Sequence, residues 1–162
     1  MSMEHSFTST IHPLKTGIQI QHKGSIVETY NKEGKLIHII DFKEASNKIV
    51  IHRWLGASSD DEVKEIFDGH LFELVKTGGY TKLMADTSKM DGFFDGINQW
   101  LADYYIPKLL KVGVRYNAFL VSEEFFSYLT DEGFDGVVES LFTTQMFGSE
   151  NKAIQWLKSV NG

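Results

Sequence analysis

The sequence predicts an α/β fold, in which a single mixed β-sheet opens with an antiparallel hairpin and has helices packed against it. Residues 35–42 (KLIHIIDF) and 48–55 (KIVIHRWL) are rich in β-branched residues, and the short connection KEASN between them is typical of a hairpin. Beyond residue 58, segments with helical periodicity alternate with short apolar runs. This alternation indicates helices that pack on a partly parallel sheet.

Length and composition exclude several classes of protein. The chain has 162 residues, 42% hydrophobic and 23% charged, which suits one domain with a sizeable core. The net charge of −6 disfavours nucleic acids and anionic membrane surfaces as partners. The absence of cysteine excludes disulfides and favours a cytoplasmic location. No apolar stretch approaches the roughly 18 residues of a membrane span.

The elements before the first helix are predicted from short local signals. Residues 1–16 lack a signal-peptide pattern, so we expect a loosely ordered lead-in followed by a single domain over 17–162. The alternating sequence GIQIQ at 17–21 predicts a short edge strand. The sequence NKEG at 31–34 predicts a turn before the hairpin.

The first helix has clear start and stop signals. Ser59 and Glu62 form a capping box, and Gly78 with Gly79 supplies the end. Between these signals, apolar residues recur at helical spacing: Val63, Ile66, Phe67, Leu71 and Leu74. A short strand is predicted at 82–86 (KLMAD).

A second helix is predicted from about residue 96 to about residue 111. Its apolar face at helical spacing contains Ile97, Trp100, Leu101 and Tyr104. Pro107 has no backbone N–H, so we expect the helix to break or kink near Tyr105.

The last third of the chain predicts two more strands and further helices. The apolar run within 114–121 is typical of a central strand, and 143–147 (TTQMF) predicts the last strand. Ser122 and Ser149 are expected to cap helices. Residues 137–142 are ambiguous, and the spacing of their apolar residues favours a helix.

The order of several short motifs resembles the SpoIIAA-like branch of the bacterial STAS superfamily over about residues 30–159. The motifs are WLG at 54–56, LMAD at 83–86, WLADYYIPKLLKVGV at 100–114, NAFLV at 117–121 and FGSENKAIQWL at 147–157. The resemblance implies the mixed-sheet STAS fold, which is also likened to the lipid-carrying SEC14 domain. It implies non-catalytic roles: sensing, protein binding and, in some members, binding of apolar molecules.

One departure from the family pattern concerns regulation by phosphorylation. STAS proteins that antagonise anti-sigma factors place a phosphorylatable serine directly after an aspartate at a helix start, where backbone amides favour a phosphate. Here Gly92 follows Asp91, and the hydroxyls of Thr87 and Ser88 lie several residues earlier. The resemblance therefore does not extend to a phosphorylation switch of the sporulation type.

An aromatic group is the strongest candidate for binding a ligand or partner. It consists of Phe93, Phe94, Trp100, Tyr104 and Tyr105. These rings fit an apolar groove or a contact patch, although Trp100 and Tyr104 also have the helical spacing of core residues. Gly92, Gly96 and Pro107 flank or interrupt the segment and are predicted to form a hinge.

Carboxylates and histidines offer weaker candidates. Asp86, Asp91 and Asp95 are the only residues on which an enzymatic interpretation would rest, and turn formation or helix capping explains them better. His38 and His52 are expected to approach each other across the hairpin, and His70 is expected to be half-buried on its helix. No third ligand is identifiable, so we predict no metal site and no cofactor.

These observations favour a non-enzymatic regulatory or interaction domain without the phospho-acceptor serine. The alternative is a carrier or sensor of a small, lipid-like apolar ligand in a pocket under the Trp100 helix. An enzyme that uses the three aspartates ranks third. The expected partner is therefore an unidentified protein or a small apolar molecule, and a homodimer through a sheet edge is left open.

Overall fold

The computed structural model describes residues 16–92 and 94–161, with the backbone but not the side chain of Asp95. Residues 1–15, which make up nearly all of the predicted lead-in, and Phe93 lie outside the described residues. The described strands form one mixed sheet in the order β1-β2-β3-β4-β5-β6-β8-β7. They are β1 (Gln19–Lys23), β2 (Ile26–Tyr30), β3 (Leu36–Asp41), β4 (Ile49–Gly56), β5 (Lys82–Met90), β6 (Tyr116–Leu120), β7 (Val137–Val138) and β8 (Thr143–Phe147).

The first half of the sheet is an antiparallel meander, and the second half is parallel. β1 to β4 pair antiparallel in chain order, β4, β5, β6 and β8 pair parallel, and β7 returns antiparallel to β8. The predicted α/β class, the mixed sheet and the opening hairpin (β3 and β4) are confirmed. β2 was not predicted, because its sequence IVETY places only Val27 and Thr29 in fully buried positions.

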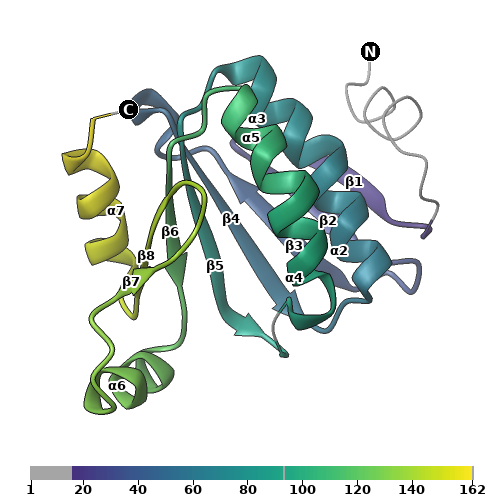
Figure 1. The fold of residues 1–162 in the computed structure, drawn as a ribbon. Helices are drawn as coiled ribbons and strands as arrows, with labels where there is room; N and C mark the ends of the chain where they lie inside the picture. Colours follow the sequence, from purple (N-terminus) through teal and green to yellow (C-terminus); the bar gives the residue numbers. More distant parts are fainter. Residues whose placement is uncertain (1–15, 93, 162) are drawn as a thin grey trace.

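The first helical segment covers one face of the sheet, called here the front face (Figure 1). It runs through α2 (Asp60–Ile66), the kinked turn η2 (Phe67–Leu71) and α3 (Phe72–Gly78), and the kink lies at Gly69, whose φ of −105° and ψ of −114° are not helical. The capping box is confirmed, because the Glu62 amide donates to Ser59 Oγ at 3.1 Å and the Ser59 amide donates to Glu62 Oε1 at 2.8 Å. Gly79, with φ of +66°, ends the segment as predicted.

The second helical segment lies beside the first on the front face (Figure 1). It comprises the 3₁₀ turn η3 (Asp95–Ile97), α4 (Asn98–Trp100), the π-helical turn η4 (Leu101–Tyr105) and α5 (Ile106–Lys111). The break expected near Tyr105 is instead this wide π turn, and Pro107 lies in the first turn of α5. The segment thus continues through the proline, which needs no amide hydrogen at the start of a helical turn.

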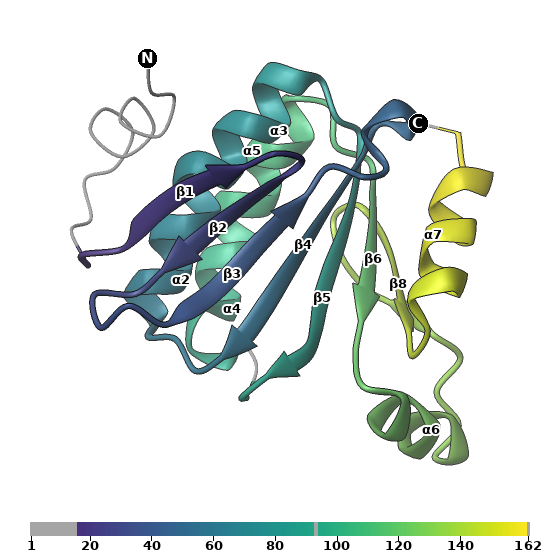
Figure 2. The ribbon, with the colours of Figure 1, turned by 180° about the vertical axis from the view of Figure 1, so that it is seen from behind.

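The C-terminal helices lie elsewhere. Ser122 caps α6 (Glu123–Asp131), and Ser149 caps α7 (Glu150–Ser159), both as predicted. α7 packs on the back face of the sheet, opposite the two helical segments, against β6 and β8 (Figure 2). No described helix covers the back face over β1 to β3 (Figure 2).

The helix predicted at 137–142 is wrong. Val137 and Val138 form β7, and the residues that follow lack regular structure. Gly136, with φ of +92°, precedes the strand, and Asp135 Oδ1 accepts a hydrogen bond from the Val137 amide. This turn directs the chain along β8, where pairing with Gln145 and Thr144 replaces helical hydrogen bonds.

Two hydrophobic cores hold these layers together. The front core contains Trp54, Ile66 and Leu109 among its buried members, and the back core contains Met84 and Leu157. In the described part of the chain, no helix is both long enough and apolar enough to cross a membrane.

Candidate functional site

A pocket of about 340 Å³ lies between the front face of the sheet and the second helical segment. The sheet contributes side chains from its four parallel strands: His52, Leu83, Ala85, Asn117, Phe119 and Thr144. The second helical segment and the turn before it contribute Phe94, Asn98, Leu101, Ala102, Tyr105, Ile106 and Leu109. Most of these side chains are apolar, and amide, hydroxyl and imidazole groups are interspersed among them. We call this space the inner pocket.

A second and more open hollow of about 660 Å³ adjoins the inner pocket. The two share part of their lining, including Ala102, Ile106 and Phe142. Residues 137–144, which include β7 and the start of β8, form most of its wall, and there Val137 and Leu141 are 60% and 62% exposed. We call this hollow the vestibule, because it lies beside the inner pocket and is more open to the surface.

The kinked turn η2 and the π turn η4 meet at the inner pocket. Phe67 of η2 and Tyr105 of η4 have ring centroids 4.9 Å apart, and Tyr105 stacks on Trp100 with an interplanar angle of 9°. Asp68 accepts hydrogen bonds from Tyr104 and Lys108, so it joins the two helical segments on the solvent side. π turns occur frequently at functional sites.

The structure separates the predicted aromatic group into two sets. Phe94 and Tyr105 line the inner pocket, whereas Trp100 and Tyr104 do not. Trp100 is half-buried against Tyr105, and Tyr104 is 43% exposed, so Tyr104 is not the core residue that its spacing suggested. Phe93 lies outside the described residues.

The π turn explains why Tyr105 is the buried tyrosine. Residues on the inner side of the segment are spaced by four: Ile97, Leu101, Tyr105 and Leu109. An α-helix has 3.6 residues per turn, so a spacing of four drifts around its surface, and a wider π turn compensates for the drift. Burial raises the pKa of the Tyr105 hydroxyl well above its ordinary value, with a smaller contribution from Asp68.

The predicted hinge residues have three different local roles. Gly92 has φ of +82°, a conformation that favours glycine. At Gly96 a Cβ atom would lie 2.3 Å from Asp60 Oδ2, so this glycine permits close packing of η3 against the start of α2. Pro107 follows the π turn. A hinge motion of this segment stays a prediction.

Three histidines form a buried cluster beside the inner pocket. His38 Nε2 and His52 Nδ1 lie 3.2 Å apart, which confirms the expected approach across the hairpin. His70 is fully buried rather than half-buried, and its Nε2 lies 2.9 Å from Thr29 Oγ1. Burial lowers the pKa of His38 well below its ordinary value, and burial lowers the pKa of His52 to about 4. Both are therefore neutral at neutral pH.

The cluster does not form a metal site in the residues that the structure describes. Among them, no group of three or more His, Cys, Asp or Glu side chains is arranged to hold a metal ion. Within the same residues, His38 Nδ1, Trp54 Nε1 and Tyr105 Oη are buried without a hydrogen-bond partner. Each such group costs about 1–3 kcal/mol of stability, so fold stability alone does not account for them.

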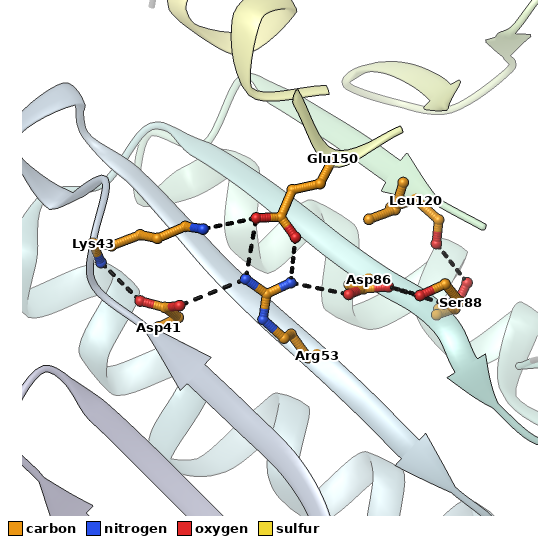
Figure 3. Close-up of polar contacts among 8 residues, drawn as sticks. Asp41, Lys43, Arg53, Asp86, Ser88, Leu120 and Glu150 are labelled. Atoms are coloured by element: carbon orange, nitrogen blue, oxygen red, sulfur yellow. Dashed lines mark hydrogen bonds and ion pairs between the residues drawn. The ribbon is translucent and has the colours of Figure 1, made fainter. Parts of the chain in front are cut away.

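A separate polar network lies on the back face around Arg53 (Figure 3). The Arg53 guanidinium donates to Asp86 Oδ2 at 3.0 Å and to Glu150 Oε1 at 2.7 Å, and it lies 3.5 Å from Asp41 Oδ2. Hydrogen bonds from Arg53 lower the pKa of Glu150 to about 2. This network was not predicted from the sequence, because its members come from four separate segments.

The predicted aspartates do not lie together. Asp86 belongs to the network around Arg53, and Asp91 does not. Asp86 is bound to Arg53 on the back face and also accepts hydrogen bonds from the amide and hydroxyl of Ser88. Asp91 is exposed after β5, and the side chain of Asp95 lies outside the described residues.

Strand β5 extends to Met90, past the predicted end at residue 86. The Thr87 hydroxyl is consequently buried, and it donates to the Leu120 carbonyl at 3.0 Å.

Replacing Arg53 by methionine should destabilise the protein by about 1–3 kcal/mol, because Asp86 and Glu150 would lose their shared cation. Urea-induced unfolding at neutral pH measures this loss. The matched control is Lys43→Met, which removes the exposed partner of Glu150 and should cost less than about 1 kcal/mol. Equal effects of the two substitutions would contradict a central role for Arg53.

Comparisons with known proteins identify no relative: no protein-family model, no curated protein and no solved structure matches this chain. The STAS resemblance therefore stays a prediction from the sequence. The inner pocket and its vestibule are the features from which a function can be argued.

Proposed function

We propose that this protein is a non-enzymatic domain that binds a small, largely apolar molecule in the inner pocket. The observation that carries the proposal is a pocket of about 340 Å³ with a mostly apolar lining between the sheet and the second helical segment. Its volume falls in the usual range for small-molecule sites, about 300–1,000 Å³. The STAS-type fold and a cytoplasmic location, both expected from the sequence, are part of this proposal.

The chemistry of the lining supports binding rather than reaction. Burial of an apolar ligand is favoured by about 0.8 kcal/mol per CH₂ group, so a small molecule gains useful affinity from such a lining. The carboxylates offered for catalysis do not converge, because Asp86 is bound to Arg53 on the back face and Asp91 is exposed. Among the described residues that line the inner pocket, Glu139 is the only carboxylate, and it is exposed.

The second helical segment is proposed as the element that admits the ligand. It begins after Gly92, whose left-handed backbone conformation favours glycine, and it contains a π turn that is joined to the first segment through Asp68. Displacement of this segment would open the inner pocket to the vestibule, in the manner of a hinged two-state element.

A regulatory role through a protein partner is the second candidate, and a different observation favours it. Val137 and Leu141 are both more than half exposed in the wall of the vestibule. Exposed apolar residues of this kind often contact partners. A protein that binds there would lie directly over the entrance to the inner pocket and would sense whether the pocket is occupied.

The proposal is tested with N-phenyl-1-naphthylamine, an uncharged probe whose fluorescence rises in apolar surroundings. We expect saturable binding by the purified protein, and a loss of affinity of about fivefold or more in Ala102→Trp and in Ala85→Ile. Ala102 and Ala85 lie on opposite walls, so each larger side chain reduces the volume from a different direction.

The matched control is Ala57→Trp, because Ala57 is exposed and outside the pocket lining. This variant should bind the probe as the unchanged protein does. Wild-type affinity in both pocket variants, with their fold retained by circular dichroism, would overturn the proposal. Absence of saturable binding to the unchanged protein would do the same.

A further inference from the structure

The described residues around the inner pocket offer no positive charge to a ligand. Among the described residues that line the inner pocket or the vestibule, none is lysine or arginine, and Glu139 is the single carboxylate. Glu139 is exposed, so its negative charge lies where a ligand would enter.

Within the described lining, His52 is the remaining side chain that could carry a positive charge, and it stays neutral at neutral pH because burial lowers its pKa. It is 1% exposed, its Nδ1 lies 3.2 Å from His38 Nε2, and its ring also contacts Trp54 and Phe67. The negative charge of Asp86 favours the protonated form, but burial outweighs it. At neutral pH the imidazole therefore offers hydrogen bonding without charge.

Two cations on neighbouring elements are engaged elsewhere. Lys108 of α5 is bound to Asp68 on the solvent side of the two helical segments. Arg53, the residue next to His52, belongs to the network on the back face with Asp86 and Glu150 (Figure 3). Neither lines the pocket, so neither pairs with an anion inside it.

From this charge distribution we infer that the inner pocket prefers uncharged ligands to anionic ones and rejects anionic amphiphiles such as fatty-acid carboxylates and aryl sulfonates. The inference rests on the proposed function and specifies the class of ligand. Moving an anion into an apolar site without a paired cation is strongly unfavourable, and repulsion from Glu139 acts in the same direction.

The size and polar groups of the inner pocket further restrict the chemical class of the ligand. At about 30 Å³ per water molecule, 340 Å³ corresponds to about eleven waters, or to a ligand of roughly ten to twenty non-hydrogen atoms. Neutral amide and hydroxyl groups from Asn98, Asn117 and Thr144 lie in the lining. A compact aromatic or aliphatic molecule with a neutral alcohol, carbonyl or amine group matches both features.

Two probes that differ by one charged group test the inference. N-phenyl-1-naphthylamine is uncharged, and 1-anilinonaphthalene-8-sulfonate has the same ring system with a sulfonate. At about pH 7.5 we expect the uncharged probe to bind the unchanged protein at least tenfold more tightly. Equal or tighter binding of the sulfonate would overturn the inference but leave the proposed function standing. Failure of the uncharged probe to bind saturably would overturn the proposed function itself, whatever the sulfonate does.

A charge reversal at the rim tests the role of Glu139. We expect Glu139→Lys to reduce the affinity ratio of the two probes by about threefold or more, because it replaces repulsion of the sulfonate by attraction. The matched control is Glu123→Lys, an identical charge change at an exposed position of α6. An unchanged ratio in Glu139→Lys, or an equal shift in the control, would contradict selection by charge at the rim.

Discussion

Replacing Tyr105 by alanine is expected to destabilise the protein by about 3–5 kcal/mol, whereas Tyr104→Ala should cost less than about 1 kcal/mol. Tyr105 is 2% exposed, and its ring contacts those of Phe67, Phe72 and Trp100. Tyr104 is 43% exposed and contributes mainly a hydroxyl contact to Asp68. Urea-induced unfolding of both variants measures the difference.

Two neighbouring tyrosines thus provide a direct test of the π turn. In a regular α-helix, position 104 would continue the face of Ile97 and Trp100, and the larger loss would follow from Tyr104→Ala. That result would contradict the arrangement described here. Tyr105→Phe serves as the control for the hydroxyl, which has no partner among the described residues. This variant should retain full stability or gain about 1 kcal/mol, since it removes a buried polar group and keeps the ring.

Acidification is expected to lower the free energy of unfolding by about 3 kcal/mol through His52 alone. The pKa of His52 falls from an ordinary value of 6.5 to about 4 in the folded protein. Between these two values the unfolded chain binds a proton that the folded protein does not bind. The contribution of His52 to the free energy of unfolding is therefore fully present above about pH 6.5 and is lost as the pH falls towards about 4. Burial also lowers the pKa of His38, so His38 acts in the same direction.

Chemical denaturation at several pH values, compared between the unchanged protein and His52→Gln, measures this contribution. The variant should show a shallower loss of stability between about pH 6.5 and 4.5. Glu150 does not confound this range, because its pKa is lowered from 4.5 to about 2 and its contribution is lost only below about pH 4.5. Parallel curves for the two proteins across this range would show that burial of His52 does not control acid stability.

Elements whose signals are local could be predicted from the amino-acid sequence. The capping box of Ser59 and Glu62, the caps Ser122 and Ser149 and the stop at Gly79 were all located correctly. Each depends on the backbone amides or carbonyls within one turn of the same helix, so neighbouring residues are sufficient to predict it. The hairpin of β3 and β4 was also predicted from local signals, namely two β-branched segments and the short connection between them.

Features that join distant segments could be seen only in the folded structure. Val137 and Val138 became a strand because β8 offered hydrogen bonds, although their spacing also suits a helix. Tyr105 rather than Tyr104 became buried because a π turn changed the register of the segment against the sheet. A pairing partner or a widened turn leaves no mark in local periodicity, because its energy comes from contacts made only when the chain is folded.

The candidate site was likewise predictable only in part. The sequence indicated that an aromatic segment would cover a pocket, but it did not show which rings line it. The pocket also includes His52 from β4, Asn117 from β6 and Thr144 from β8, which lie far apart along the chain. The histidine cluster likewise needed Thr29 and His70 from separate elements. Their proximity, and with it the charge and shape presented to a ligand, follows from the order of the strands, which is a property of the whole sheet.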